Sequence, residues 1–550
     1  MRAGAPRLLA MATESGAPEI EEYDAAPITV ARSAPDLIWL ILSVGIVLTI
    51  GIFLRLYARS DLWADEALSV NIAQLPYSEL RAALEQDGAP PLYYLLLKPW
   101  IGLFGASTFA VRSLSGVIGI VTLVPMWFAG RRLDNRRAGA GLQSPEVRTV
   151  AWTSLLLLAA SPFAIRYATE ARMYCVVVLL VTLGYLAVLR SLDQPSIGRL
   201  FTVAALAALL VYTHYWSFFL VGIVALWLVV CAVRGDPIRR NATWRTFIAM
   251  LLGISTFLIW LPTFLYQLEH TGTPWGEQIA PVASLAEAFK SFGGNTQAAG
   301  WALLLVAGLA LFARAVDAMH FEVDLRTRPG VRVEVGIGIA VLLGGLVLSR
   351  IAGTTFEARY AAVIFPLFIL AAAFGVTVFA SRTVRYGAVV ILLVLGFWGG
   401  TSNALRSRTQ AFEIANVIGS EAHAGDVVVY CPDSIGIDVR RLLGSDIQQI
   451  GFPDLVPSRL IDWTDYSERV ADRAPLDVAR RLLSAAGPKN DIWFVYTSGE
   501  GRISTKCNVI ADYLAFFRPA RVRVIEPNPY FFEHHGLYRY LPGEVEQSSP

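Results

Sequence analysis

Long apolar stretches alternate with short polar connections from residue 37 to about residue 402. An α-helix needs about 20 predominantly apolar residues to cross a bilayer, so the pattern predicts membrane-spanning helices. Eleven stretches predict spans, at about 36–56, 107–130, 149–165, 173–190, 200–215, 217–233, 246–266, 299–316, 333–350, 361–380 and 387–402. Several of them are shorter than a perpendicular span, so the pattern predicts their existence better than their ends.

The placement of arginine orients these spans. Basic residues gather in four connections, at 131–148, 234–245, 314–332 and 381–385. The positive-inside rule places such connections in the cytoplasm. An even number of predicted spans separates each basic connection from the next, so the assignment is consistent with itself. It places the other connections outside, at 57–90, 166–174, 213–216, 267–298 and 354–360, together with the chain after residue 403.

The segment PPLYYLLLKPWIGLFG (90–105) does not fit this alternation. It is apolar, but it has only sixteen residues and contains Lys98-Pro99. A full crossing here would break the parity that the arginine-rich connections set. We interpret it as an interfacial or partly inserted helix, and a tilted or irregular crossing is the alternative. The predicted number of transmembrane helices therefore lies between eleven and thirteen.

The chain changes character after residue 402. The β-branched and aromatic runs 426–431 and 491–498 predict strands, and 475–487 and 506–517 predict helices. Two further runs, 521–526 and 535–542, predict edge strands. We therefore expect an α/β domain over 403–550, outside the membrane. Before it lie a membrane domain over 36–402, with its first outer connection at 57–90, and a disordered cytoplasmic tail over 1–35.

Composition supports the membrane class. Of 550 residues, 55% are hydrophobic and only 16% are charged, whereas soluble domains carry about 25% charged residues. The formal net charge of +2 gives no reason to expect a nucleic-acid partner. The chain also lacks a Walker A loop, an HExxH motif and a CxxC pair.

Four cysteines divide into two pairs. Cys175 and Cys231 lie inside apolar runs, where cysteine behaves as a small buried hydrophobe. Cys431 and Cys507 lie in the polar C-terminal part. If that part faces an oxidising compartment, a disulfide between them is one outcome and two free thiols are the other.

Ionisable and aromatic side chains gather on the predicted outer face. The set comprises Asp61, Asp65, Glu66, Arg166, Tyr167, Glu170, Arg172, Tyr174, His214, Tyr215, Glu357, Arg359 and Tyr360. Most lie on short connections, which must keep them near the membrane surface, where charges are costly and point to function. Arginine presents a planar fork of donors to phosphate oxygens, and a nearby carboxylate can take a proton from an attacking hydroxyl.

Each of these residues also has an ordinary structural interpretation. Arg166 and Arg172 could be interfacial anchors, Glu170 could merely pair with one of them, and His214 could cap a helix or belong to the aromatic belt. Asp65 and Glu66 could serve only as the acidic first turn of a helix. Each of these explanations is sufficient for one residue taken alone. Six such features on one face favour a shared site.

Four motifs in order resemble GT-C-fold membrane glycosyltransferases of the protein O-mannosyltransferase and aminoarabinose-transferase type, over residues 37–380. They are WADEA (63–67), PPLYYLLL (90–97) with LFGASTFAVRSLSGVIG (103–119) and RRL (131–133), SPFAIRYATEARMY (161–174) and FEARYAAVIFPLF (356–368), with THYW between the last two. The resemblance implies a polyprenyl-phosphate monosaccharide as the donor. It also implies transfer of the sugar, with inversion, to an acceptor hydroxyl outside the membrane.

The resemblance assigns roles to individual residues. Asp65 matches the aspartate of the first outer loop, the general base, and Glu66 accompanies it as a second catalytic carboxylate. Arg166, Arg172 and Arg359 would face the donor phosphate. The remaining residues of the predicted site, as substrate-binding groups, are Asp87, Tyr167, Glu170, His214 and Tyr360.

The sequence departs from the family at one place. Many members have histidine just before the PPLYY motif, whereas this chain has Ala89 in DGAPPLYY. The role of that histidine is therefore either absent or taken over by Asp87, His214 or Lys98. Some GT-C relatives require a divalent cation, so the resemblance leaves a cation open, and no residue is predicted here as a metal ligand.

The predicted protein is thus a multi-pass enzyme of the plasma or inner membrane that transfers a monosaccharide, mannose first among the candidates. Its acceptor would be a protein or a glycan or lipid of the cell envelope. Arabinofuranosyl or other pentosyl transfer is the nearest alternative. A lipid or sugar transporter would predict inverted repeats and polar groups at the bilayer midplane, which the sequence lacks. A non-catalytic scaffold would leave the outer-face cluster unexplained.

Overall fold

The structure is a computed structural model that describes ten ranges of the chain: 34–139, 148–273, 280–294, 297–317, 320–327, 330–351, 355–444, 446–457, 459–497 and 501–542. Residues 1–33 of the predicted disordered tail lie outside these ranges. The chain forms two compact units, Met1–Gly45 and Ile46–Pro550. The site described below belongs entirely to the second unit, and the domain boundaries expected after residues 35 and 402 stay predictions.

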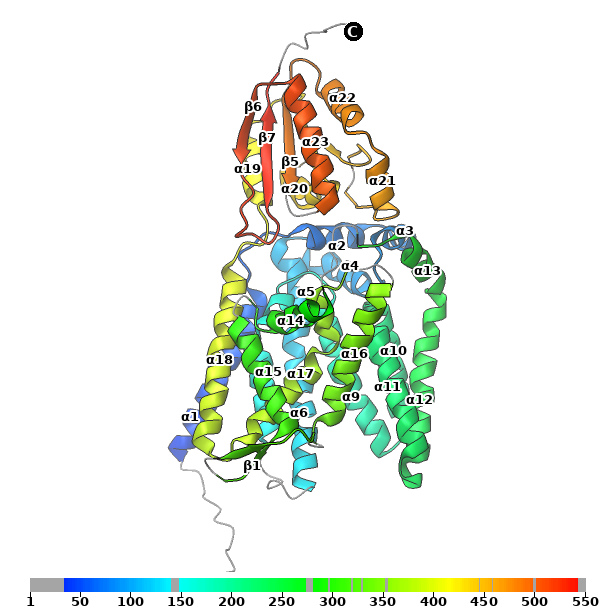
Figure 1. Cartoon of the computed structure of the whole chain (residues 1–550), viewed down its shortest axis with the longest axis vertical. Helices are drawn as coiled ribbons and strands as arrows, with labels where there is room; N and C mark the ends of the chain where they lie inside the picture. The colour runs from blue at the N-terminus through cyan, green and yellow to red at the C-terminus, as the bar shows by residue number, and fades with distance from the viewer. Residues whose placement is uncertain are drawn as a thin grey trace, which may run out of the picture. The chain divides into compact units, whose positions relative to one another are not determined.

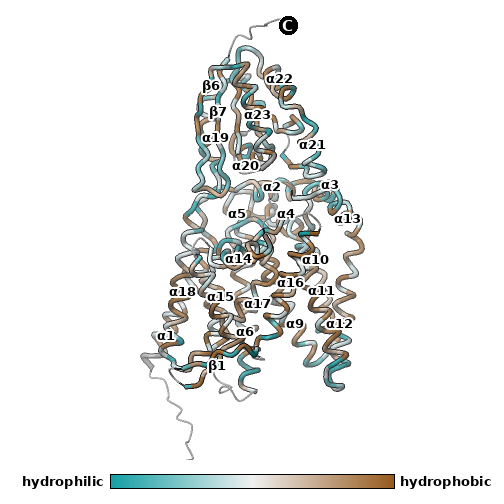
Figure 2. The backbone as a smooth tube through the Cα atoms, viewed as in Figure 1, coloured by the Kyte–Doolittle hydropathy of each residue, from teal (hydrophilic) through white to brown (hydrophobic). Residues whose placement is uncertain are grey.

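Every predicted apolar stretch forms helix over most of its length, and the stretch 299–316 ends in a strand at Ala313–Ala315. The helices are α1 (Ala34–Leu56), α5 (Thr108–Val121), α6 (Leu123–Gly139), α7 (Thr149–Ala160), α8 (Pro162–Ala168), α9 (Tyr174–Asp193), α10 (Ile197–Thr213), α11 (Ser217–Arg234), α12 (Pro237–Ser255), α13 (Leu261–His270), α14 (Pro281–Phe292), α15 (Gln297–Phe312), α16 (Arg332–Ile351), α17 (Phe365–Gly375) and α18 (Arg382–Leu405). Among the described residues, six helices are long and apolar enough to cross a membrane, or up to eight if each bent pair is one span. Several shorter apolar helices accompany them. The chain is a multi-pass helical membrane protein, as predicted (Figures 1 and 2).

Several spans are broken into shorter pieces that begin with proline. Proline fits the first turn of a helix, where its missing N–H has no intrahelical partner anyway. Ser161 ends α7 and caps α8, since its Oγ accepts a hydrogen bond from the backbone N of Ala164 at 3.2 Å, and Pro162 begins α8. The two helices meet at an angle of 54°. This bend directs the connection from Thr169 to Met173 into the site described below.

Three short helices follow α1 on the side that the sequence places outside. They are α2 (Ala64–Gln74), α3 (Tyr77–Asp87) and α4 (Leu92–Phe104). Figure 1 shows α2 and α3 lying across one end of the long helices. With thirteen residues, α4 is about 20 Å long and too short to cross ~30 Å of hydrocarbon. This length favours the interfacial interpretation of segment 90–105.

The basic connections meet at the opposite end of the helices. Arg136 near the end of α6 binds Glu334 at the start of α16, with 2.6 Å between Nη1 and Oε1. Arg137 donates a hydrogen bond to Thr377, in the 3₁₀ turn η3 (Val376–Val378) that follows α17. A hairpin of β1 (Ala313–Ala315) and β2 (Phe321–Val323) also lies here and was not predicted. The grouping agrees with the single cytoplasmic face that the arginine pattern predicts.

The C-terminal part is an α/β fold around a five-stranded sheet. Its strands are β3 (Val427–Cys431), β4 (Gln448–Gly451), β5 (Ile492–Thr497), β6 (Arg521–Ile525) and β7 (His535–Tyr540), in the order β4-β3-β5-β7-β6. Its helices are α19 (Ala411–Glu421), α20 (Gly436–Leu443), α21 (Tyr466–Asp472), α22 (Pro475–Ala486) and α23 (Gly501–Phe517). The alternation of side chains along β3 and β5 buries both faces of the sheet. Residues of α19 and α20 pack on one face, and residues of α22 and α23 pack on the other.

The sheet corrects one prediction. Residues 535–542 were expected to form an edge strand, but β7 lies between β5 and β6 and is antiparallel to both. Its polar residues suggested an exposed edge, yet most of the strand is buried. The reason is that β6 covers its outer side. Strand β4 and helices α19, α20 and α21 were not predicted.

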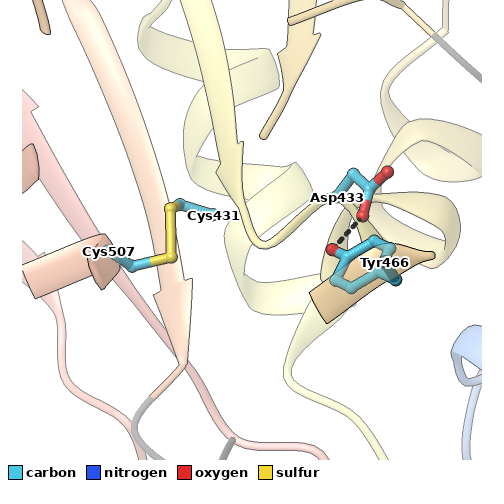
Figure 3. The surroundings of a disulfide bond; sticks show 4 residues. All are labelled: Cys431, Asp433, Tyr466 and Cys507. Atoms are coloured by element: carbon cyan, nitrogen blue, oxygen red, sulfur yellow. Dashed lines mark hydrogen bonds between the residues drawn. A yellow bond between two sulfur atoms is a disulfide. The ribbon is translucent and has the colours of Figure 1, made fainter. Parts of the chain in front are cut away.

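Cys431 and Cys507 form a disulfide that joins the end of β3 to α23 (Figure 3). Seventy-six residues separate the two cysteines. Both are fully buried, and the bond therefore lies inside the C-terminal core. Of the other two cysteines, Cys175 is buried and Cys231 is half-buried.

Removal of this disulfide is expected to destabilise the C-terminal fold. Replacing both Cys431 and Cys507 by Ser frees a long loop in the unfolded chain, which costs about 2–4 kcal/mol of unfolding free energy. Thermal unfolding of the purified protein measures the loss, and Cys175→Ser is the matched control. Peptide mapping without reductant should recover one cross-linked peptide pair. Two free thiols at these positions would contradict the disulfide.

Candidate active site

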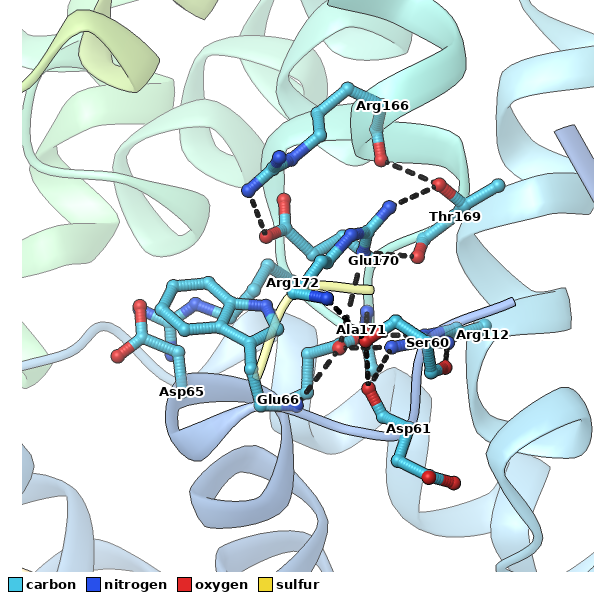
Figure 4. A network of polar contacts seen from close by, with 12 residues as sticks. Ser60, Asp61, Asp65, Glu66, Arg112, Arg166, Thr169, Glu170, Ala171 and Arg172 are labelled. Atoms are coloured by element: carbon cyan, nitrogen blue, oxygen red, sulfur yellow. Dashed lines mark hydrogen bonds and ion pairs between the residues drawn. The ribbon is translucent and has the colours of Figure 1, made fainter. Parts of the chain in front are cut away.

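Helix α2 presents two adjacent carboxylates from its first turn. Asp65 and Glu66 follow Trp63, whose backbone N donates a hydrogen bond to Glu66 Oε2 at 3.4 Å. Negative charge is favourable at a helix N-terminus, so both carboxylates also suit the helix itself. Successive helical side chains point about 100° apart, and Figure 4 shows these two directed to different sides. The Asp65 side chain is 29% exposed and the Glu66 side chain 0%.

Glu66 is the centre of a buried ion network. Arg112 of α5 binds it in a bidentate manner, with 2.8 Å from Nε to Oε1 and 2.5 Å from Nη2 to Oε2. The backbone N of Ala171 donates to Oε1 at 2.8 Å, and Arg408 Nη1 lies 4.0 Å from Oε2. Burial alone would raise the pKa of Glu66, but the two arginines and the Ala171 bond outweigh it and lower the pKa. Glu66 is therefore a permanent anion.

The two arginines connect Glu66 to distant parts of the chain. Arg112 also donates to the carbonyl oxygens of Ser60 and Asp61, which fixes the chain leading into α2 (Figure 4). Arg408 lies just after α18 and donates to the carbonyl oxygen and the hydroxyl of Thr169, at 2.7 and 2.6 Å. Four segments thus converge on one carboxylate, which explains why α2 has a fixed place.

Asp65 faces two other arginines. Its Oδ2 accepts a hydrogen bond from Arg359 Nη1 at 3.0 Å and lies 3.7 Å from Arg172 Nη2. Arg172 is held by Ser69, one turn along α2, with 3.1 Å between Nη1 and Oγ. Burial disfavours the charge on Arg172, but Asp65 and other nearby acidic groups outweigh burial and keep its pKa above the usual value. The result is a half-exposed carboxylate between two permanent cations.

Arg166 and Glu170 lie on another side of the cluster, at the α8 end of the bent span. Arg166 and Glu170 form an ion pair (Figure 4), with 3.8 Å between Nη2 and Oε1. The Arg166 guanidinium also lies over the ring of Phe532, 5.5 Å from its centroid. Phe532 in turn packs edge-on against Trp63, with 5.3 Å between the ring centroids. The β6–β7 turn of the C-terminal part therefore covers this side of the site.

An aromatic layer continues from Tyr167. Ring centroids lie 4.7 Å apart for Tyr167 and Tyr174, 5.7 Å for Tyr174 and His214, and 5.3 Å for His214 and Tyr360. His214 Nδ1 accepts a hydrogen bond from the backbone N of Trp216 at 3.2 Å. Burial, with Arg172 and Arg359 nearby, lowers the pKa of His214 to about 3. His214 is therefore neutral at physiological pH and serves as a polar aromatic group.

Asp87 and Lys98 are candidate replacements for the histidine that many GT-C glycosyltransferases have at the position of Ala89, and each has its own partners. Asp87 accepts a hydrogen bond from the Tyr94 hydroxyl at 2.8 Å. Burial raises the pKa of Asp87, although Arg172 and Tyr94 oppose the shift. Lys98 donates to the carbonyl oxygens of Ala73 and Leu75. Lys98 therefore supports the end of α2, while Asp87 stays within electrostatic reach of Arg172.

The structure thus groups the predicted site residues into one cluster and adds five that were not predicted. These are Trp63, Tyr94, Arg112, Arg408 and Phe532. The sequence contains a signal for a functional role of Arg112, because an arginine inside an apolar run is costly and rare. Arg408 and Phe532 belong to a part of the chain that was expected to fold separately, so their contacts with this cluster were not predicted.

Two further features of the structure concern the binding of a metal ion or of another ligand. Within the described ranges, one group of histidine, cysteine or acidic residues is close enough to hold a metal ion, namely Asp438, Glu533 and His535, and Asp65 is not part of it. An apolar cavity of about 550 Å³ lies between α9, α10, α11 and α16. None of its lining residues belongs to the cluster around Asp65, so the cavity is separate from the candidate active site.

The sequence matches no protein-family model and no curated protein. Solved structures do match. ArnT from Cupriavidus metallidurans in the apo state aligns with a TM-score of 0.56 and 13% identity, over 92% of this chain and 99% of ArnT. The same protein bound to undecaprenyl phosphate gives a TM-score of 0.42, 13% identity and coverage of 94% and 100%. Arabinofuranosyltransferase AftD from Mycobacteria aligns with a TM-score of 0.45 and 13% identity, over 92% of this chain and 42% of AftD. The first alignment confirms the predicted GT-C fold.

Proposed function

We propose that this membrane protein is a glycosyltransferase that transfers a monosaccharide from a polyprenyl-phosphate donor to a hydroxyl group, with inversion. One observation carries the proposal. A half-exposed carboxylate, Asp65, lies between two half-buried arginines, 3.0 Å from Arg359 and 3.7 Å from Arg172. This combination supplies a base for an acceptor and cations for a phosphate. The GT-C fold that the chain shares with ArnT supports the same class of reaction.

In the proposed reaction Asp65 takes the proton of the acceptor hydroxyl. The hydroxyl oxygen forms a bond to the anomeric carbon as the bond from that carbon to the phosphate oxygen breaks. Polyprenyl phosphate leaves with an additional negative charge, and the proton remains on Asp65 until it is released to water. Arg359 and Arg172 stabilise the charge that develops on the leaving phosphate. Because attack and departure occur on opposite sides of the anomeric carbon, the product is inverted.

The other residues of the cluster have supporting roles in this proposal. Glu66 is a positioning residue, because its buried carboxylate is fully engaged by Arg112 and Ala171 and cannot reach a substrate. Arg166 extends the cationic surface toward the donor phosphate. The sugar would lie near the polar and aromatic groups Asp87, Tyr167, Glu170, His214 and Tyr360.

We further propose that this end of the protein and its C-terminal part lie outside the cytoplasm. The basic connections at the opposite helix ends support this orientation through the positive-inside rule. A membrane-borne donor fits it, since nucleotide sugars do not occur outside the cell membrane. The enzyme would thus work at the plasma or inner membrane on a protein or on a glycan or lipid of the cell envelope. Mannose is the first sugar to test, and a pentose such as arabinofuranose is the second.

A donor panel tests the proposed function. Purified protein in lipid vesicles is incubated with synthetic polyprenyl-phosphate mannose, glucose, arabinofuranose and aminoarabinose, together with a mixture of hydroxyl acceptors. We expect one donor to be consumed, with release of polyprenyl phosphate and formation of an inverted glycoside. The Asp65→Asn variant, run in parallel, should leave that donor intact. Movement of the donors across the vesicle membrane without cleavage would instead identify a transporter and contradict the proposal.

A further inference from the structure

Three potential metal ligands meet where the C-terminal fold contacts α2. Asp438 lies in the first turn of α20, Glu533 in the turn between β6 and β7, and His535 at the start of β7. One ligand atom from each lies within 4.8 Å of the others. His535 Nε2 is 4.0 Å from Asp438 Oδ2. Asp438 is therefore brought from a distant part of the sequence to the neighbouring residues Glu533 and His535, so that an imidazole and two carboxylates meet at one point.

The imidazole of His535 provides a second observation, independent of this grouping, that indicates a bound ligand. The residue is only 1% exposed, yet neither ring nitrogen has a hydrogen-bond partner among the residues that the structure describes. Buried polar atoms are nearly always paired, so a pair of unmatched ring nitrogens requires an explanation. The backbone is fixed at this point, since the His535 N donates to Gln410 Oε1 at 3.0 Å. The ring is thus held in place and directed at Asp438.

We propose that Asp438, Glu533 and His535 form a binding site for one divalent transition-metal ion of the zinc type. Zinc is bound by imidazole nitrogen and carboxylate oxygen in tetrahedral geometry, with bonds of about 2.0–2.2 Å that place neighbouring ligand atoms roughly 3.4 Å apart. His535 and Asp438 are 4.0 Å apart, and all three ligand atoms lie within 4.8 Å of one another, so ion binding requires the atoms to approach by about 1.4 Å at most. Two carboxylates balance the charge of the ion, and a water molecule can fill the fourth position.

Hydrogen bonds with neighbouring residues orient Asp438 and Glu533, as is usual for metal ligands. Asp438 Oδ2 accepts a hydrogen bond from Thr409 Oγ1 at 2.7 Å, and Oδ1 accepts one from the backbone N of Val439 at 2.9 Å. Hydrogen bonds of this kind orient ligating carboxylates. The backbone N of Glu533 donates to the carbonyl oxygen of Arg408 at 2.8 Å. The carboxylate of Asp438 and the backbone of Glu533 are therefore held by contacts that are independent of the ion.

The site also connects to the candidate active site. The backbone N of Ala64, at the start of α2, donates to Glu533 at 3.1 Å (Oε2) and 3.3 Å (Oε1). An ion that fixes Glu533 would therefore fix the first turn of α2, which carries Asp65. The role assigned to the metal is to fasten the C-terminal fold to this helix. The inference does not depend on the proposed sugar transfer.

Metal analysis of the full-length protein tests this site. Protein purified in detergent is stripped with a chelator, reloaded with Zn²⁺ or Co²⁺, and analysed by elemental mass spectrometry. We expect one ion per chain, and Co²⁺ should give visible absorption bands of a tetrahedral site. His535→Ala and Asp438→Asn should each weaken Zn²⁺ binding by more than tenfold. His423→Ala removes an exposed histidine of the same fold and should bind Zn²⁺ like the wild type.

Two results would overturn the inference. The first is wild-type protein that binds no Zn²⁺ or Co²⁺ after stripping and reloading, or that releases Zn²⁺ when Mg²⁺ alone is added. The second is full Zn²⁺ binding by both ligand variants. If a variant does not fold, X-ray absorption of the Zn²⁺-loaded wild type decides the question. The expected spectrum has one imidazole and only oxygen otherwise, and a spectrum with sulfur or several imidazoles contradicts the assignment.

Discussion

Replacement of Asp65 by Asn is expected to reduce sugar transfer by about 10²- to 10⁴-fold, the usual contribution of a general base. Asparagine has nearly the shape of aspartate but cannot accept a proton at neutral pH. The side chain is 29% exposed, so the change should leave folding intact. Initial rates with the donor identified in the panel measure the loss. Thermal unfolding of the same preparation shows whether the fold is unchanged.

Asp61→Asn is the matched control. Asp61 precedes α2 in the same outer connection, and it contributes its carbonyl oxygen, not its carboxylate, to Arg112. The control should therefore retain nearly the wild-type rate. A wild-type rate in the Asp65→Asn variant would remove Asp65 from the role of base. Loss of activity with a matching loss of stability would show a structural role instead.

The membrane part of the fold could be predicted well because its signal is local. An apolar run must form helix in lipid, since no other conformation satisfies its backbone groups within the segment. The arginine pattern then places Asp65, Arg172 and Arg359 on one face, and the structure brings these three together. The breaks within spans were not predicted, because they depend on single residues such as Ser161 and Pro162.

The C-terminal part was predicted less completely because its signals are long-range. Strand β7 was assigned to an edge, whereas its neighbours β5 and β6 are chosen by packing that the local pattern does not contain. The same limit applies at the site. Arg408, Phe532 and Glu533 contact α2 or its ion network from more than 300 residues away. Nothing near them in the sequence identifies α2 as their partner.

These contacts change the interpretation of the C-terminal part. A separate accessory domain would leave the active site complete without it. Here Phe532 packs on Trp63, Glu533 binds the start of α2, and Arg408 contributes to the Glu66 network. We infer that the C-terminal fold helps to hold helix α2 in place.

Replacement of Glu66 by Gln is expected to cause a large loss of stability, whereas Asp65→Asn is expected to lower activity and leave the fold intact. Glutamine can still accept the Ala171 hydrogen bond, but it leaves Arg112 buried without a counter-charge. Breaking a buried ion pair from one side costs about 3–5 kcal/mol of unfolding free energy. Thermal or denaturant unfolding in detergent, followed by tryptophan fluorescence, measures the loss. Any fall in activity should follow the fraction of unfolded protein.

Glu170→Gln is the matched control, because Glu170 is also buried but its carboxylate forms a single, longer ion pair within the described ranges, 3.8 Å from Arg166. Its loss should cost much less than the loss of Glu66. The double variant Glu66→Gln with Arg112→Gln should recover part of the stability, since it leaves no charge of this pair unmatched. If Glu66→Gln unfolds like the wild type and loses only activity, Glu66 takes part in the reaction itself. In that case both carboxylates of α2, and not Asp65 alone, would act on the substrate.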